Sequence, residues 1–137
     1  YKRQVQNHPY RDDLEIVYTS LEGDEATTFT RGFGRLVNGE ARITLGETFA
    51  YVSNPDLGLS AHLTPRGEWA DLYVVELSTD ELIVRAAPGD PDVAFDFIVF
   101  GLRIGLEDFP VMRPNRSESF LPTEESFDED RGFDPQL

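Results

Sequence analysis

Residues that most often carry chemistry are scarce in this sequence of 137 residues. The chain has two histidines, His8 and His62, and no cysteine. The lack of cysteine excludes disulfides, thiolate metal sites, thiol nucleophiles and iron–sulfur clusters. The sequence also contains no serine nucleophile elbow, no phosphate-binding glycine loop before a helix and no dinucleotide-binding fingerprint. We therefore expect no catalytic residue, no cofactor and no metal site, and we predict that the protein is not an enzyme.

Carboxylates are the one abundant reactive group. With 26 acidic against 12 basic residues, the net charge is −14, which repels nucleic acid and anionic lipid. So many carboxylates place some pairs together by chance, so an acid–base or glycosidase pair is a weak interpretation. Asp90, Asp92 and the cluster at 124–130 could bind calcium through oxygen ligands, but they lack EF-hand spacing. Solvated acids on a turn and a tail explain them more simply.

Two aromatic residues are candidates for ligand binding. Trp69 follows a turn at 64–67, and Tyr73 follows shortly afterwards. An exposed tryptophan on a β turn could stack on a sugar ring, although such a residue is more often a core or interface anchor. Arginine outnumbers lysine by 11 to 1, and we expect the arginines in strands to pair with carboxylates.

The elements that must position these residues are predicted to be strands. Apolar and polar residues alternate at 14–19, 41–45, 59–64 and 82–86, which is typical of strands with one buried face. Asn38-Gly39 predicts a type I′ hairpin turn between strands at 33–37 and 41–45. Only residues 47–52 suit a helical turn. We predict an all-β fold, a small antiparallel sandwich or barrel-like unit of about seven strands.

Two segments are apolar on both faces, 72–77 and 93–104. A strand of this kind is covered on both faces, and a chain this short needs a second copy to supply one of the covers. We therefore expect a homo-oligomer whose shared core includes Phe95, Phe97, Val99 and Phe100.

The two ends of the chain differ from its middle. Residues 1–13 predict an extended N-terminal arm, residues 14–112 the β domain, and residues 113–137 an extended acidic tail. The tail is either disordered or an arm whose phenylalanines fill pockets on a neighbouring subunit. For the second case the predicted anchors of the two arms are Tyr10, Phe120, Leu121, Phe127 and Phe133.

Several pieces of sequence, in this order, carry a resemblance. They are Asn-His-Pro at 7–9, Leu-Glu-Gly-Asp-Glu at 21–25, the stretch at 34–45, Leu-Thr-Pro-Arg-Gly at 63–67 and the stretch at 95–103. Together they resemble the C-terminal module of bacterial and phage fibre-like proteins, which is similar to trimeric tail-fibre and surface-fibre domains. The resemblance covers about residues 7–107. It implies a non-enzymatic β unit whose strands interlock with those of other copies in a homotrimer.

The residues and the resemblance lead to one expectation of function. We expect a structural subunit of an extracellular fibre or filament, on a cell surface or a virion tail, whose partners are copies of itself. No apolar run is long enough to span a bilayer. The alternative is a tip module that binds a carbohydrate or a cell-surface receptor through Trp69 and Tyr73. An interface polysaccharide depolymerase is a third, weaker interpretation.

Overall fold

The structure, a computed structural model, describes residues 3–115 and confirms the all-β fold. It contains one short helix and eight strands within that range. The elements are β1 (Arg3–Asn7), β2 (Glu15–Thr19), β3 (Thr27–Arg35), β4 (Glu40–Thr44), α1 (Glu47–Val52), β5 (Ser60–Arg66), β6 (Leu72–Leu77), β7 (Glu81–Ala86) and β8 (Ala94–Leu102).

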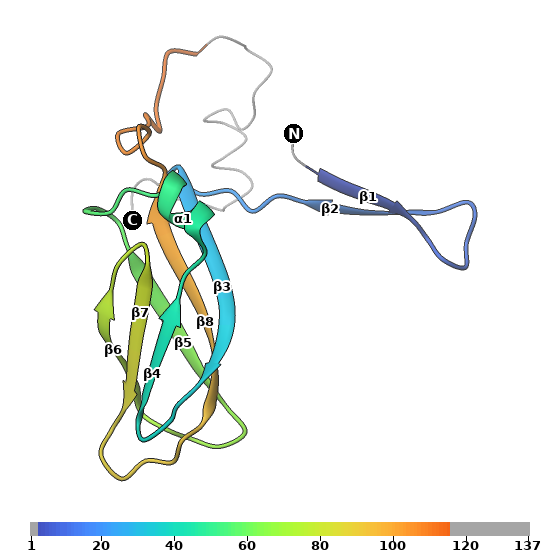
Figure 1. Ribbon diagram of the computed structural model, residues 1–137. Coiled ribbons are helices and arrows are strands. Elements are labelled where there is room, and N and C mark those ends of the chain that lie inside the picture. Colours follow the sequence, from blue (N-terminus) through green and yellow to red (C-terminus); the bar gives the residue numbers. More distant parts are fainter. Residues whose placement is uncertain (1–2, 116–137) are drawn as a thin grey trace, which may run out of the picture.

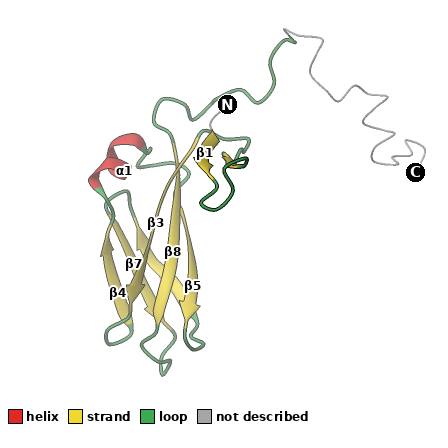
Figure 2. Ribbon diagram, turned by 90° about the vertical axis from the view of Figure 1, so that its right-hand side faces the viewer, coloured by secondary structure: helices red, strands yellow, loops and turns green. Residues whose placement is uncertain are grey.

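Six of the strands form a sandwich of two antiparallel sheets (Figure 1, Figure 2). The first sheet has the order β3-β8-β5 and the second the order β4-β7-β6. Strands β1 and β2 form a separate two-stranded sheet. We call the first two sheets the first and the second sheet below.

The core lies between the two sheets and follows the two-residue period of the strands. In β8, Phe95, Phe97 and Val99 point inward and are buried, while the residues between them are more exposed. Leu82 and Val84 of β7 meet them from the second sheet. Burying each of these side chains contributes about 1.5–3 kcal/mol, so this one chain builds a core of its own.

The predicted turn at Asn38-Gly39 is confirmed, but it does not close a hairpin. Asn38 and Gly39 have φ values of 53° and 78°, as a type I′ turn requires. Only Val37 and Glu40 pair across the turn, because β3 then pairs with β8 and β4 with β7. The turn therefore connects the two sheets.

The helical turn predicted at 47–52 is confirmed as α1. Its Phe49 is buried in the core, and α1 covers one end of the sandwich (Figure 1). No other helix occurs between residues 3 and 115, and α1 is far too short to cross a membrane.

The N-terminal residues form a strand pair where a single extended arm was expected. Strand β1 pairs along its full length with β2, so residues 3–7 of the predicted arm are joined to residues 15–19 of the predicted β domain. Within the described chain, β1 and β2 contact each other and no other strand or helix. This hairpin projects sideways from the end of the sandwich where α1 lies (Figure 1).

Neither of the two segments predicted to be covered on both faces is covered in that way within this chain: β8 is buried on one face, and β6 has no fully buried residue. In β6, Tyr73, Val74 and Val75 are exposed, and a bulge shifts the register between Val74 and Glu76. In β8, Ile98 is partly exposed on the outward side. A second cover from another copy stays a prediction.

Two glycines of β3 make room for the largest core rings. Gly34 faces Phe95 and Gly32 faces Phe97 across the strand pair. A Cβ atom at Gly34 would lie 2.8 Å from Phe95 Cζ and 3.0 Å from Ile43 Cδ1. The rings of β8 therefore lie over the bare backbone of β3 and fill the space that side chains of β3 would otherwise take.

Gly34→Ala is therefore expected to destabilise the sandwich. The added methyl group would force the buried ring of Phe95 to move, at a cost of about 1–3 kcal/mol in the free energy of unfolding. The matched control is Gly23→Ala, because a Cβ atom there has no neighbour within 4 Å and should change stability by less than about 0.5 kcal/mol. Urea denaturation measures both values, and equal stability of the two variants would contradict this packing.

Candidate functional site

Strand β3 turns its large residues outward and its small residues, which are half-buried, toward the core. Phe29 and Phe33 point outward with 65% and 80% of their surface exposed, whereas Gly32 and Gly34 point toward the core. A half-buried strand normally shows the reverse arrangement. Large apolar residues exposed side by side mark surfaces that bind something.

The neighbouring strands extend this surface. Register places Phe29 beside Phe100, Arg31 beside Ile98 and Phe33 beside Asp96. The ring of Phe100 lies 6.3 Å from that of Phe29 and 5.5 Å from that of His62. We call this surface the outer face; its residues are Phe29, Arg31, Phe33, Arg35, Asp96, Ile98, Phe100, Ser60, His62, Thr64 and Arg66.

The outer face is positively charged in a strongly acidic protein. It carries Arg31, Arg35 and Arg66 against the single acid Asp96, which gives a net charge of +2, whereas the whole chain has −14. Asp96 lies 3.6 Å from the guanidinium of Arg66, and both side chains are mostly exposed. Such a pair is weak, and it leaves the two arginines of β3 without a carboxylate partner among the described residues.

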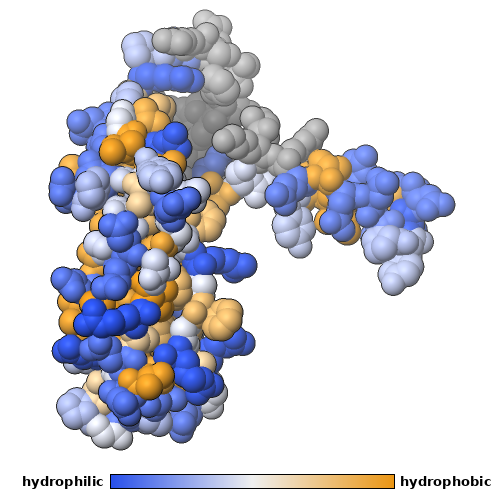
Figure 3. All heavy atoms as spheres, in the orientation of Figure 1, coloured by the Kyte–Doolittle hydropathy of each residue, from blue (hydrophilic) through white to orange (hydrophobic). Residues whose placement is uncertain are grey.

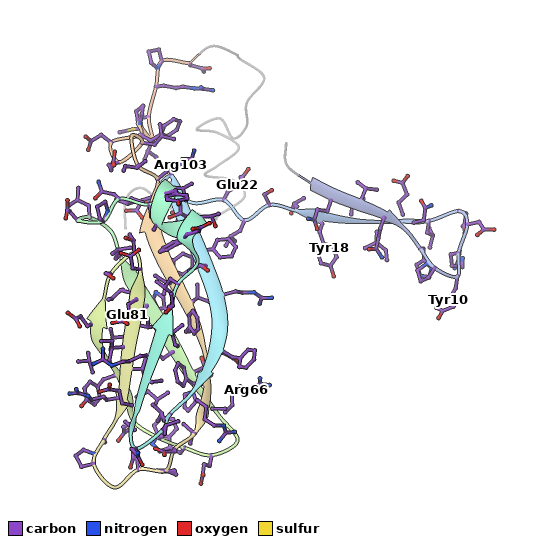
Figure 4. All side chains as sticks on the ribbon, viewed as in Figure 1. Tyr10, Tyr18, Glu22, Arg66, Glu81 and Arg103 are labelled. Atoms are coloured by element: carbon purple, nitrogen blue, oxygen red, sulfur yellow. The ribbon has the colours of Figure 1, made fainter. Side chains whose placement is uncertain are left out.

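The outward side of the second sheet contrasts with this face, because its charges pair with one another. The carboxylate of Glu40 accepts hydrogen bonds from Arg85 at 2.8 Å and Arg42 at 3.0 Å, and Arg42 also lies 3.6 Å from Glu81. The hydrogen bond from Arg85, aided by Arg42, lowers the pKa of Glu40. Ile83 of β7 is buried among these residues. Figure 4 shows Glu81 and Arg66 on different sides of the sandwich.

The projecting hairpin is the second unusual surface. Val5 and Val17 pair on one of its faces, and Ile16 and Tyr18 lie on the other. Val5, Val17 and Tyr18 are exposed, and Figure 3 shows hydrophobic residues of the hairpin open to solvent between hydrophilic ones. An isolated two-stranded hairpin is at best marginally stable in water, so these apolar residues are suited to packing against something outside this sandwich.

The structure separates the interface residues that the sequence predicts. Tyr10 is 89% exposed at the far tip of the hairpin (Figure 4), and Phe100 is half-buried on the outer face. Phe95, Phe97 and Val99 are buried in the core of a single chain, so they need no second copy to cover them. Phe120, Leu121, Phe127 and Phe133 lie outside the described residues.

The two predicted ligand-binding aromatics do not share one pocket. Trp69 is 75% exposed in the loop between β5 and β6. Tyr73 lines an open hollow of about 590 Å³ with Arg85, Asp90 and other residues, and Trp69 is not among them. The loop of Trp69 is nevertheless held in place by two hydrogen bonds of Asp71. The backbone N–H of Asp71 donates to the carboxylate of Asp90 at 2.8 Å, and the backbone carbonyl of Asp71 accepts from the N–H of Ala87 at 2.9 Å.

The remaining chemical candidates have structural roles. The carboxylate of Asp92 accepts backbone hydrogen bonds from Asn38 at 2.9 Å and Gly39 at 2.8 Å, and so fixes the turn between the sheets. Nδ1 of His8 accepts a hydrogen bond from the backbone N–H of Tyr10 at 3.1 Å. In the part of the chain that the structure describes, no group of three histidines or acids is placed to hold a metal ion.

The outer face of β3 was not predicted, although the sequence contains a signal for it. Residues 27–35 alternate strictly, with aromatic or basic residues at 29, 31, 33 and 35 and only threonine or glycine between them. Gly32 and Gly34 lie on the same face of the strand, and because they have no side chains, that face can belong to a core only if rings from a neighbouring strand fill the space. That pattern predicts an outward aromatic face.

Comparison with models of protein families, with curated proteins and with solved structures gave no match. The features observed in residues 3–115 define a fold class only: a six-stranded β sandwich with a projecting hairpin. The resemblance to fibre-like modules stays a prediction.

The charge network of the second sheet predicts a pH dependence that Glu40→Gln should remove. Because the pKa of Glu40 in the folded chain lies below its ordinary value of 4.5, its ionised form stabilises the fold above that pH. The contribution disappears as the pH falls through the lowered folded value. The unfolding temperature of wild type should therefore exceed that of Glu40→Gln at neutral pH, and the two should converge in acid.

Glu68→Gln is the control for this prediction, because Glu68 is exposed in a loop and forms no ion pair with the residues between 3 and 115. Thermal unfolding followed by circular dichroism between about pH 2 and pH 7 measures the difference. A gap between wild type and Glu40→Gln that stays constant over this range would contradict the assigned role.

Proposed function

We propose that this protein is a non-enzymatic structural subunit of an extracellular fibre or filament, and that it assembles by contacts between copies of itself. The projecting hairpin carries this proposal. Its apolar side chains lie on both faces, and it has no contact with its own sandwich. A second copy is a partner that is always present at the same concentration.

The outer face gives independent support. It presents aromatic and basic residues and shares no residue with the hairpin. Each chain therefore has at least two different surfaces suited to association, the outer face and the hairpin. Contacts between different surfaces are heterologous, and they build rings when the rotation closes and filaments when it does not. A homotrimer and an open filament are the two forms of this assembly.

Sedimentation equilibrium of the whole chain tests the proposal. Wild type at micromolar concentration should sediment at a multiple of 15.5 kDa. Val17→Glu places a charge in the centre of one apolar hairpin face, and it should weaken association by about tenfold or more. The thermal stability of the sandwich should not change, because the hairpin does not touch it.

The matched control is Val111→Glu, which makes the same substitution at an exposed valine outside the hairpin. This variant should associate as wild type does. The proposal fails if wild type sediments as one chain, and the role of the hairpin fails if the two variants behave alike.

A second candidate function rests on Trp69. This side chain is largely exposed in a loop that hydrogen bonds fix to the neighbouring loop, and a rigid exposed indole is suited to stacking on a sugar ring. The loop lies at the end of the sandwich opposite α1 (Figure 1). The surface of a carbohydrate or a cell-surface receptor would then meet the tip of the subunit.

Trp69→Ala should abolish binding on a glycan array if this candidate is correct, with the sandwich still folded. Tyr73→Ala tests whether the second aromatic contributes, since it lies on β6 outside that loop. Retention of all glycan signals in Trp69→Ala, or no signal for wild type, would exclude this function.

A further inference from the structure

We propose that the outer face of one copy binds the C-terminal segment 116–137 of a second copy. This inference rests on the proposed function, because it requires contact between copies, and it names the segment and the surface that meet. The segment lies outside the described residues, so the argument uses its sequence and the geometry of the outer face.

Charge favours this occupant. The segment holds seven acids against two arginines, so its net charge is −5, while the outer face carries +2. Most of the protein is acidic and repels such a segment, so the basic outer face is the part of the described surface that attracts it. Complementary charge of this kind steers association and sets register.

The pattern of the segment mirrors that of β3. On β3, Phe33 lies between Arg31 and Arg35, and all three side chains share the outward face. In the segment, Phe127 stands between Glu125 and Glu129 with the same two-residue spacing. An extended chain would present that acid–phenylalanine–acid row on one side, opposite in charge to the arginine–phenylalanine–arginine row.

The edge of the first sheet next to Arg31, Phe33 and Arg35 has no neighbouring strand among residues 3–115. β3 is the end strand of its sheet, and an open groove of about 610 Å³ between β3 and β4 is lined by Phe33, Arg35 and other residues. An unpaired strand edge accepts an extended peptide through main-chain hydrogen bonds. The segment can therefore add backbone pairing to its side-chain contacts.

Length permits the contact. The 22 residues of 116–137 span up to about 70 Å when extended, whereas the nine residues of β3 span about 30 Å. The segment is long enough to leave its own sandwich and follow β3 of a neighbour.

Cross-linking of whole chains tests the proposal, because the native sequence contains no cysteine. One chain carries Ser126→Cys in the segment, and the other carries Thr64→Cys on the outer face. Thr64 lies two strands from Phe33 in the same row, about 10 Å across the sheet, within reach of a flexible bismaleimide. The control is Thr19→Cys, an exposed threonine on β2 that belongs neither to the outer face nor to the groove between β3 and β4.

We expect the two mixed chains to cross-link through Thr64→Cys about ten times more than through Thr19→Cys, with the joined peptides identified by mass spectrometry. Arg31→Glu with Arg35→Glu in the chain that carries Thr64→Cys should lower the yield. Glu125→Arg with Glu129→Arg in the chain that carries Ser126→Cys should restore it.

Equal cross-linking yields at the two threonine positions would overturn the proposal. A chain that carries both Ser126→Cys and Thr64→Cys gives a second test, because cross-links found only within single chains would also overturn it. If these results occur while the wild-type protein sediments as an oligomer, the docking fails and the proposed function stands. If wild type sediments as a single chain, both fail.

Discussion

The packing of two phenylalanine rings against bare backbone is the constraint on which the surface of this protein depends. Phe95 and Phe97 occupy the space above Gly34 and Gly32, so the inward side of β3 has no volume left for a side chain at these two positions. Strand geometry sends alternate residues to opposite faces. The only place that remains for the aromatic residues of β3 is therefore the outside, and the core itself produces an exposed aromatic face.

The distribution of charge separates the two sheets by role. On the second sheet Glu40 joins Arg42 and Arg85 in hydrogen-bonded pairs, and the surface is neutralised within the chain. On the first sheet the arginines of β3 lie beside exposed phenylalanines, and the local charge opposes that of the whole protein. Exposed ion pairs contribute little to stability, so this difference matters for what approaches each sheet more than for the fold.

Local signals predicted local structure in this protein, and the failures concern partners distant in sequence. Asn38-Gly39 determines its own φ values, and Phe49 identifies the buried side of α1, so both were predictable. The pairing of β3 with β8 rather than β4 is not local, because it depends on rings from residues 95 and 97 filling the glycine positions. Similarly, the sequence at 1–13 contains no sign that β2 supplies its partner. The exposure of Phe29 and Phe33 was therefore missed, because it follows from that distant packing.

The chain enters the sandwich just before β3 and leaves it just after β8, and these two points lie next to each other. The backbone N–H of Arg103, just after β8, donates to the carbonyl of Ala26, just before β3, at 2.8 Å. The hairpin and the C-terminal part therefore depart from the end that α1 covers (Figure 1), while the turn at Asn38-Gly39 and the loop of Trp69 lie at the other. The two ends of the sandwich therefore differ: one carries the hairpin and residues 103–115, and the other presents loops held by hydrogen bonds to Asp90 and Asp92. Polarity of this kind is what repeated heterologous contacts need, because each copy then offers its neighbour a different surface from the one it uses itself.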